Sequence, residues 1–129
     1  MPTDKAPAPI GPYSQAICLE EEGLLFTAGQ IAIDPGTGQM VAGGIEEQTR
    51  MVLENLKAVI KAAGSDTGKT VKTTIYLKNM DDFPKVNAIY ETYFSRQPYP
   101  ARSTVEVASL PKGALVEIDA VVKIPGGKG

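Results

Sequence analysis

Arg102 and Glu117 are the two side chains of this sequence whose types and spacing could support catalysis. Both lie in the stretch PARSTVEVASLPKGALVEIDAV (100–121), which is typical of two short strands joined by a turn. An arginine carries a planar fork that binds a carboxylate through two hydrogen bonds. A partly buried glutamate can order a water molecule and exchange a proton with it. The alternative interpretation is a structural ion pair between Arg102 and either Glu117 or Asp119.

We expect strands 102–107 and 114–122 to pair as an antiparallel hairpin around ASLPKG (108–113). With Val107 opposite Ala114, Thr104 faces Glu117 and Arg102 faces Asp119. Arg102 and Glu117 are then diagonal neighbours on one face, about 7–8 Å apart, which suits a small carboxylated molecule and a water. A slip of one residue in this register would put them on opposite faces.

Three further residues could line the same site, although each also has a purely structural interpretation. Tyr13 follows a Gly-Pro turn in GPYSQA (11–16) and could offer a ring and a hydroxyl, or simply be a partly buried tyrosine. Gly29 ends a strand, where a glycine permits close approach of the backbone to a ligand, or else makes a bulge. Thr104 could donate a hydrogen bond to a ligand, but threonine is also a good strand former.

The chain lacks histidine, which excludes a Ser–His–Asp or Cys–His nucleophile and an imidazole metal site. The single cysteine, Cys18, excludes a thiolate zinc site and an internal disulfide, and so favours a reducing compartment. The net charge of −2 argues against a nucleic-acid partner. Because we find neither an apolar run of about 18 residues nor a secretory leader, we expect a cytoplasmic protein that does not enter the membrane.

The elements that must position these residues alternate between strands and helices within one domain, 1–129. Apolar residues at helical spacing predict a helix over 46–63, and a second helix is expected from Asp81 to about Phe94. The expected strands, besides the two closing ones, cover 14–19, 24–28, 31–33, 39–41 and 71–78. This order predicts an α+β fold in which two helices pack on one face of a mixed sheet.

The closing strand carries apolar residues on both faces, since Leu115 and Val121 alternate with the apolar set Val116, Ile118, Ala120, Val122 and Ile124. Two helices can cover only one face of a sheet. We therefore expect the other face to meet a second copy of the chain, which predicts a homo-oligomer.

Five collinear blocks resemble the RidA family, also called YjgF, over about residues 9–123. The blocks are GPYSQA (11–16), TAGQI (27–31), NAIYETYF (87–94), PARSTVEVASLP (100–111) and VEIDAV (116–121). The resemblance implies a chorismate-mutase-like subunit assembled as a homotrimer, with clefts between subunits. It also implies a deaminase without cofactor or metal, which hydrolyses enamines and imines such as 2-aminoacrylate, 2-iminopropanoate and 2-iminobutanoate to 2-keto acids and ammonia.

In this resemblance Arg102 matches the arginine that binds the substrate carboxylate, and Glu117 matches the glutamate that handles the water. Tyr13 matches the pocket tyrosine and Gly29 the glycine of the cleft wall. The chain departs from many members in having Thr104 in place of a cysteine and Ala28 in place of a serine. Thr104 removes any thiol-dependent behaviour, and Ala28 removes one hydroxyl, which could shift the substrate preference.

Two other functions fit the same residues. A regulatory trimer could bind small 2-keto acids in its clefts without turnover, because it would need the same arginine. A ribonuclease or translation inhibitor is disfavoured by the acidic charge balance and by the missing histidine.

Overall fold

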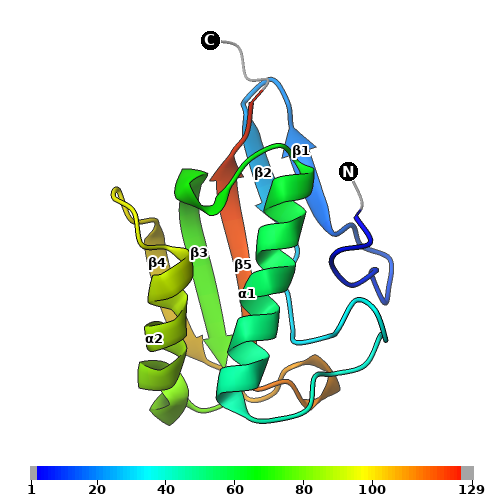
Figure 1. The fold of residues 1–129 in the computed structure, drawn as a ribbon, viewed down its shortest axis with the longest axis vertical. Coiled ribbons are helices and arrows are strands. Elements are labelled where there is room, and N and C mark those ends of the chain that lie inside the picture. The colour runs from blue at the N-terminus through cyan, green and yellow to red at the C-terminus, as the bar shows by residue number, and fades with distance from the viewer. Residues whose placement is uncertain (1–2, 126–129) are drawn as a thin grey trace.

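The computed structural model describes residues 3–125 as one layer of helices packed on one sheet (Figure 1). The strands are β1 (Ala16–Leu19), β2 (Leu24–Thr27), β3 (Thr70–Leu77), β4 (Ala101–Glu106) and β5 (Val116–Lys123). The helices are α1 (Ile45–Ala62) and α2 (Phe83–Tyr93), with 3-10 turns at Thr67–Lys69, Met80–Asp82 and Pro111–Gly113. Among these residues no helix is long and apolar enough to cross a bilayer.

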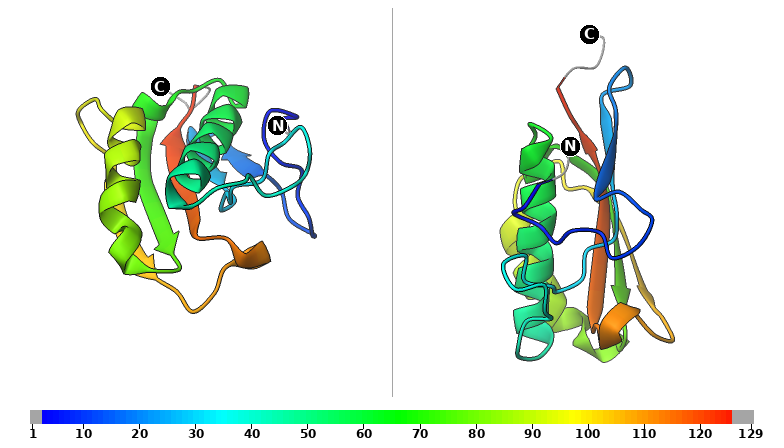
Figure 2. Two further views of the ribbon diagram at one scale, coloured as in Figure 1. Left: turned by 60° about the horizontal axis from the view of Figure 1, so that its bottom comes forward. Right: turned by 90° about the vertical axis from the view of Figure 1, so that its right-hand side faces the viewer.

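The sheet is mixed, with the strand order β1-β2-β5-β3-β4. All pairs are antiparallel except β3 and β4, which run parallel because α2 carries the chain back between them. Both helices lie on one face of the sheet, as the right-hand view of Figure 2 shows. The prediction of an α+β subunit with two helices on one face of a mixed sheet is confirmed.

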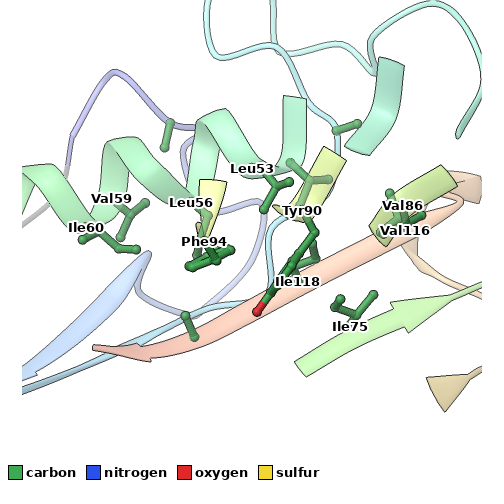
Figure 3. Close-up of a cluster of buried hydrophobic side chains, with 14 of the residues drawn as sticks. Leu53, Leu56, Val59, Ile60, Ile75, Val86, Tyr90, Phe94, Val116 and Ile118 are labelled. Carbon is green, nitrogen blue, oxygen red and sulfur yellow. The ribbon is translucent and has the colours of Figure 1, made fainter. Parts of the chain in front are cut away.

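The core lies between the helices and the sheet (Figure 3). Helix α1 turns Leu53, Leu56 and Ile60 toward the sheet at the spacing that its sequence predicts, and all three are fully buried. Its N-terminus is stabilised by Glu47, whose Oε1 accepts a hydrogen bond from the Gly44 amide at 2.9 Å. The predicted helix over 46–63 is therefore confirmed to within one residue at each end.

The predicted pairing of the two closing strands is wrong. β5 pairs with β2 and β3, while β4 pairs only with the far edge of β3. A crossover helix places its two strands side by side, so α2 brings β4 against β3 and leaves β5 the opposite edge of β3. The loop between them crosses the end of β3, where the Lys78 amide donates to the Leu115 carbonyl at 3.0 Å. The expected strands at 31–33 and 39–41 are reduced to one isolated bridge between Ile33 and Met40.

The second face of the sheet is left open by this arrangement. It carries exposed apolar side chains on three different strands, Ile17, Phe26 and Val105, which are 52%, 42% and 42% exposed. Along β5 the buried residues of the helix side alternate with half-buried residues of the open side, among them Glu117, Asp119 and Val121. The expectation that the closing strand has apolar residues on both sides is met at Val121, although Glu117 and Asp119 share its open side. Neither helix covers that side of the sheet, as Figure 2 shows.

Candidate active site

A cavity of about 380 Å³ contains four of the residues that the sequence singled out, namely Tyr13, Ala28, Gly29 and Glu117. We call it the Glu117 pocket. Most of its remaining lining is apolar and comes from the N-terminal segment, the loop after β2 and the 3-10 turn before β5. The apolar residues are Pro7, Ala8, Ile10, Ile31, Ile33 and Pro111. Among the described residues, Glu117 is the only carboxylate in this lining.

Gly29 lies directly against the Glu117 side chain. The backbone of the next residue, Gln30, is tied to β5 by two hydrogen bonds with Ile118, of 2.8 and 3.1 Å. A Cβ atom built on Gly29 would lie only 2.7 Å from Cδ of Glu117, a distance that no real side chain tolerates. Only glycine therefore allows the Glu117 carboxyl to lie where it does.

The segment that follows Gly29 is also fixed from the helix side. Asn55 of α1 is 1% exposed, and its Nδ2 donates to the carbonyl oxygens of Ile31 and Ile33 at 3.2 and 2.9 Å. These bonds satisfy a buried amide and hold an irregular loop that has no sheet partner of its own over most of its length. The pocket wall at Ile31 and Ile33 is thus attached to both layers of the fold.

Glu117 is set up to bind and release a proton. Its pKa is raised above the ordinary glutamate value, mainly because burial disfavours the charged form and secondly because of the nearby Asp119. Its carboxylate makes no hydrogen bond to any side chain or backbone group of residues 3–125. An acid with a raised pKa in an apolar pocket is a common property of functional sites.

Asp119 has a different role on the same strand. Its Oδ2 accepts a hydrogen bond from the Tyr76 hydroxyl at 3.1 Å, on the open face of the sheet. Burial raises the pKa of Asp119, and the bond from Tyr76 and the charge of Lys72 work in the opposite direction. Asp119 is therefore already paired and does not bind Arg102.

Tyr13 lies at the rim of the pocket and is 51% exposed. The chain turns tightly before it, since the Tyr13 amide donates to the Gly11 carbonyl at 2.8 Å. Its hydroxyl accepts a hydrogen bond from the Ile10 amide at 3.4 Å, so the ring is held against the N-terminal segment.

Arg102 lies elsewhere, on the helix side of β4. Its Nη1 donates to Oδ1 of Asn87 at 2.7 Å, and its guanidinium lies over the rings of Phe83 and Tyr90, at 5.2 and 4.8 Å from the ring centroids. The expectation that Arg102 and Glu117 are neighbours on one face is wrong. Arg102 is aligned with Thr73 on β3 and Glu117 with Tyr76, and these alternate positions point to opposite faces of the sheet.

The alternative of a structural ion pair is equally wrong. The single ion pair among residues 3–125 joins Arg96 to Asp66, at 3.4 Å. Arg102 therefore has no carboxylate of residues 3–125 within 4 Å, although it is exposed and charged. It lines a second cavity of about 670 Å³, the Arg102 pocket, together with Asn87, Tyr90, Glu91, Phe94, Ser95, Tyr99 and Pro100.

Thr104 lies two residues after Arg102 on the same face of β4 and is aligned with Ile75 rather than with Glu117. It is half-buried and belongs to the lining of neither pocket. The prediction that Thr104 faces Glu117 is wrong for the same reason as the hairpin, since β3 lies between β4 and β5.

Two residues of structural importance were not among the predicted site residues. Asn87 positions Arg102 and is itself oriented by Glu91, whose Oε1 accepts a hydrogen bond from its Nδ2 at 3.0 Å. Gln15 is a buried amide that holds the N-terminal segment beside the Glu117 pocket. The sequence carried one signal for Asn87, a polar residue within the apolar pattern of α2.

No cluster of three or more metal-ligating side chains exists among residues 3–125.

Comparison with known proteins identifies the family. Residues 3–124 match the family described as Endoribonuclease L-PSP. The 2-iminobutanoate/2-iminopropanoate deaminase of Mus musculus is 48% identical over 119 residues, which are 92% of this chain and 86% of that protein.

Solved structures agree in both fold and sequence. A protein of the conserved Rid family from Yersinia pestis has a TM-score of 0.91 and 52% identity, covering 95% of this chain and 96% of its own. The TdcF protein of E. coli, solved with bound serine, has a TM-score of 0.88 and 40% identity, with 95% of each chain covered. The chain therefore belongs to the RidA (YjgF) family, as its five sequence blocks predict.

Proposed function

We propose that this protein is a hydrolytic deaminase that converts 2-imino acids and their enamine tautomers to 2-keto acids and ammonia. The substrates are 2-aminoacrylate with its imine 2-iminopropanoate, and 2-iminobutanoate. The observation that carries the proposal is the Glu117 carboxyl, which lies against Gly29 in an apolar pocket with a raised pKa. The name of the mouse relative, and the amino acid bound to TdcF, support a small carboxylated ligand.

The complete site is formed between two copies of the chain, which assemble as a homotrimer. One subunit cannot combine its own Arg102 with its own Glu117, because the two residues lie on opposite faces of the sheet. The open face carries exposed apolar side chains that a second copy would bury, among them Phe26 and Val105. In the trimer the Arg102 pocket of one subunit meets the Glu117 pocket of its neighbour.

Arg102 clamps the substrate carboxylate. Its Nη1 is occupied by Asn87, which leaves the rest of the guanidinium fork for the carboxylate oxygens. The rings of Phe83 and Tyr90 restrict the guanidinium to one orientation. The substrate is thus bound at its invariant end, and its electrophilic C2 atom is directed to the neighbouring subunit's Glu117 pocket.

Glu117 moves the protons. As a carboxylate it takes a proton from a water molecule while the water oxygen bonds to C2 and the C=N π electrons move to nitrogen. As a carboxylic acid it gives that proton to the nitrogen, which leaves a carbinolamine with a hydroxyl and an amino group on C2. The carboxylate then takes the hydroxyl proton and passes it to the nitrogen, so that the C–N bond breaks, ammonia leaves and C2 becomes a carbonyl carbon. One water is consumed for each ammonia released, and no electrons are transferred to or from the substrate.

The other predicted site residues have supporting roles in this proposal. Gly29 leaves room for the carboxyl of Glu117, and Tyr13 closes the rim of the pocket. Ala28 contacts the substrate in the Glu117 pocket, and Thr104, two residues after Arg102 on the same face of β4, lies beside the carboxylate-binding arginine. None of these steps uses a cofactor or metal, and we propose that the protein works in the cytoplasm without a nucleic-acid or membrane partner.

The test is the release of 2-keto acid from 2-aminoacrylate generated in the assay by a pyridoxal-phosphate dehydratase. We expect the wild type to release keto acid faster than the blank and Arg102→Ala to match the blank. Met80→Ala removes an exposed side chain outside both pockets and serves as the control variant. A wild-type rate equal to the blank refutes the deaminase.

A ligand-binding trimer without turnover is the second candidate, because the Arg102 pocket would bind a 2-keto acid equally well. Calorimetric titration with 2-oxobutanoate, alongside the deaminase assay, separates the two functions. Binding that depends on Arg102, in a protein that releases no keto acid, would favour the regulatory role. Incubation with RNA tests the ribonuclease, which the description of the matching family suggests and which intact RNA would dismiss.

A further inference from the structure

Tyr90 of α2 connects the Arg102 guanidinium to the interior of the protein. It is 5% exposed, and the guanidinium carbon of Arg102 lies 4.8 Å from the centroid of its ring. The ring also packs against Phe94, with 4.5 Å between the two ring centroids. Tyr90 therefore contacts both the buried core and the group that binds the substrate carboxylate in the proposed function.

A buried hydrogen bond fixes the hydroxyl end of this ring. The hydroxyl oxygens of Tyr90 and Thr73 lie 2.8 Å apart, and either group can be the donor. Figure 3 shows the Tyr90 hydroxyl oxygen pointing from α2 toward the sheet. Thr73 is fully buried in β3 and is aligned with Arg102 on β4, so the two residues are neighbours on the same face of the sheet. Tyr90 thus extends from Thr73 on one strand to Arg102 on the next.

The pair of hydroxyl groups is not needed to fill the core. A phenylalanine and a valine would occupy almost the same space as Tyr90 and Thr73, and neither would bring a polar group to satisfy. Replacing both partners of a buried hydrogen bond by apolar groups of the same shape is nearly neutral for stability, whereas removing one partner leaves the other unsatisfied. Stability alone therefore does not explain why this part of the core carries two hydroxyl groups.

The contacts that the described residues make with the Arg102 guanidinium come from uncharged groups. Its Nη1 donates to the amide oxygen of Asn87, and burial raises the pKa of the Tyr90 phenol, so this ring stays neutral at physiological pH. No carboxylate of residues 3–125 lies within 4 Å of the guanidinium. The charge of Arg102 is therefore held in place without being neutralised, which leaves it to attract the substrate carboxylate.

We propose that Thr73 and Tyr90 are positioning residues for substrate binding, because their shared hydrogen bond fixes the ring on which the Arg102 guanidinium lies. Tyr90 acts by contact with Arg102, and Thr73 acts through Tyr90. This inference rests on the proposed function, in which Arg102 binds the substrate carboxylate. It predicts an effect on binding rather than on the proton transfers at Glu117, since an arginine that is already oriented loses less side-chain freedom when the carboxylate binds.

The experiment compares Tyr90→Phe, Thr73→Val and the double variant with the wild type. Deaminase kinetics give KM and kcat, calorimetric titration with 2-oxobutanoate gives Kd, and thermal unfolding gives Tm. We expect each variant to raise KM and Kd about fivefold, which is the effect of having to order one long side chain on binding, with little change in kcat. The double variant should not exceed the single ones, because all three lose the same hydrogen bond.

Three comparisons separate a positioning role from a structural one. The Tm of Thr73→Val should fall, because the Tyr90 hydroxyl is left buried without a partner, and the double variant should regain most of this Tm while its KM and Kd stay raised. Thr73→Ser keeps a hydroxyl and should keep the wild-type KM. Thr49→Val is the matched control, since Thr49 is also fully buried and its hydroxyl donates to the Ile45 carbonyl at 2.7 Å, outside both pockets. It should lower Tm and leave KM unchanged.

The Arg102 side chain can also be followed by NMR in the protein without ligand. The ring currents of Tyr90 and Phe83 should shift its Nε–H signal upfield, because the guanidinium lies over both ring faces. Arg102→Lys removes this signal and so assigns it. We expect Tyr90→Phe and Thr73→Val to move the signal toward the position of a free arginine.

The outcomes separate this inference from the function on which it rests. A double variant with the wild-type KM, Kd and Arg102 signal overturns the positioning role and leaves the deaminase intact. A raised Kd and a displaced Arg102 signal in the variants, when even the wild type releases no keto acid, support the positioning role and overturn the deaminase. An equal rise of KM in Thr49→Val would show a general effect of lost stability and would also overturn the inference.

Discussion

The Arg102 pocket and the Glu117 pocket hold the two charged groups of the proposed site by opposite means. Arg102 is directed by contacts, namely a 2.7 Å hydrogen bond to Asn87 and the faces of two aromatic rings. Glu117 has no such partner among residues 3–125, and its position follows from a glycine that leaves space beside it. Directed contacts thus orient the Arg102 guanidinium, whereas burial raises the pKa of the Glu117 carboxyl.

This difference matches what each group has to do. A group that binds an invariant carboxylate gains from a fixed direction, because each hydrogen bond then forms without further loss of side-chain freedom. A group that must both accept and donate a proton gains from a pKa nearer the working pH, and burial shifts the pKa of Glu117 in that direction. The Arg102 pocket thus provides a fixed direction, and the Glu117 pocket provides a raised pKa.

The largest expected effect comes from removing either charged residue and then combining the two variants in one oligomer. Arg102→Ala and Glu117→Gln should each lower kcat/KM by about 10²–10³, as expected for the loss of one charged group from a reaction centre. When the two variants are unfolded, mixed in equal amounts and refolded together, about a quarter of the sites should contain both native residues and regain activity.

The deaminase assay of the mixture, against each variant refolded alone, measures this recovery. A site contained within one chain predicts no recovery at all, because every chain would then carry one defect. A mixture as inactive as its components, with the oligomer shown intact by size-exclusion chromatography, would contradict the shared site.

Gly29→Ala tests the means by which Glu117 is positioned. The added Cβ would overlap the carboxyl group, which must shift, and because this group is the end of a flexible side chain we expect little loss of stability. A displacement of this size at a reacting group should lower kcat about 10–100-fold. The control is Gly44→Ala, whose Cβ would meet nothing closer than 4.0 Å. An active Gly29→Ala enzyme would show that the position of the Glu117 carboxyl is not critical.

Variants of Asn87 and Glu91 test whether the hydrogen bonds from Glu91 through Asn87 to Arg102 direct the guanidinium. Asn87→Ala should raise KM about tenfold with a smaller change in kcat, because it disorders the group that binds the substrate. Glu91→Ala should raise KM about threefold, and Glu91→Gln, which keeps an acceptor for Asn87 Nδ2, should restore most of the loss. A fall in kcat at constant KM would contradict a role in binding.

The sequence predicted what depends on local periodicity. The apolar spacing of α1 and the two faces of β5 both follow from residue order alone. The prediction of strand pairing failed, because the hydrophobic pattern of β4 does not say whether β3 or β5 lies beside it. The crossover through α2 decides this pairing, and with it the face on which Arg102 lies.

Most candidate residues were predicted from residue type and local pattern, and the family blocks added Ala28 and gave each residue a role. Tyr13, Ala28, Gly29 and Glu117 do share one pocket. The contacts that position the pocket walls could not be foreseen, because Gln15 and Asn87 act through side-chain hydrogen bonds to loops whose course the sequence does not specify. Their residue types alone are common in loops and helices.

The smallest expected effect is a pH-dependent shift in Tm that distinguishes the half-buried Glu117 from the exposed Glu47. The pKa of Glu117 is raised by burial and Asp119, so the folded state binds more protons than the unfolded state just above the ordinary glutamate value. The stability contributed by this group is therefore present below that value and is lost as the pH rises through the raised pKa. Glu117→Gln does not undergo this loss, so relative to the wild type its Tm should increase from pH 4 to pH 7, by a few degrees at most.

Glu47 provides the matched comparison, because its pKa is lowered by backbone hydrogen bonds at the start of α1, its own amide's first and that of Gly44 second. Its contribution to stability is present above the ordinary glutamate value and is lost as the pH falls, so the Tm of Glu47→Gln relative to the wild type should decrease from pH 4 to pH 7. Calorimetric scans of the three proteins at both pH values measure the two slopes. Opposite signs would show that the fold keeps Glu117 at the expense of stability, whereas slopes of the same sign would contradict the raised pKa on which its proposed catalytic role depends.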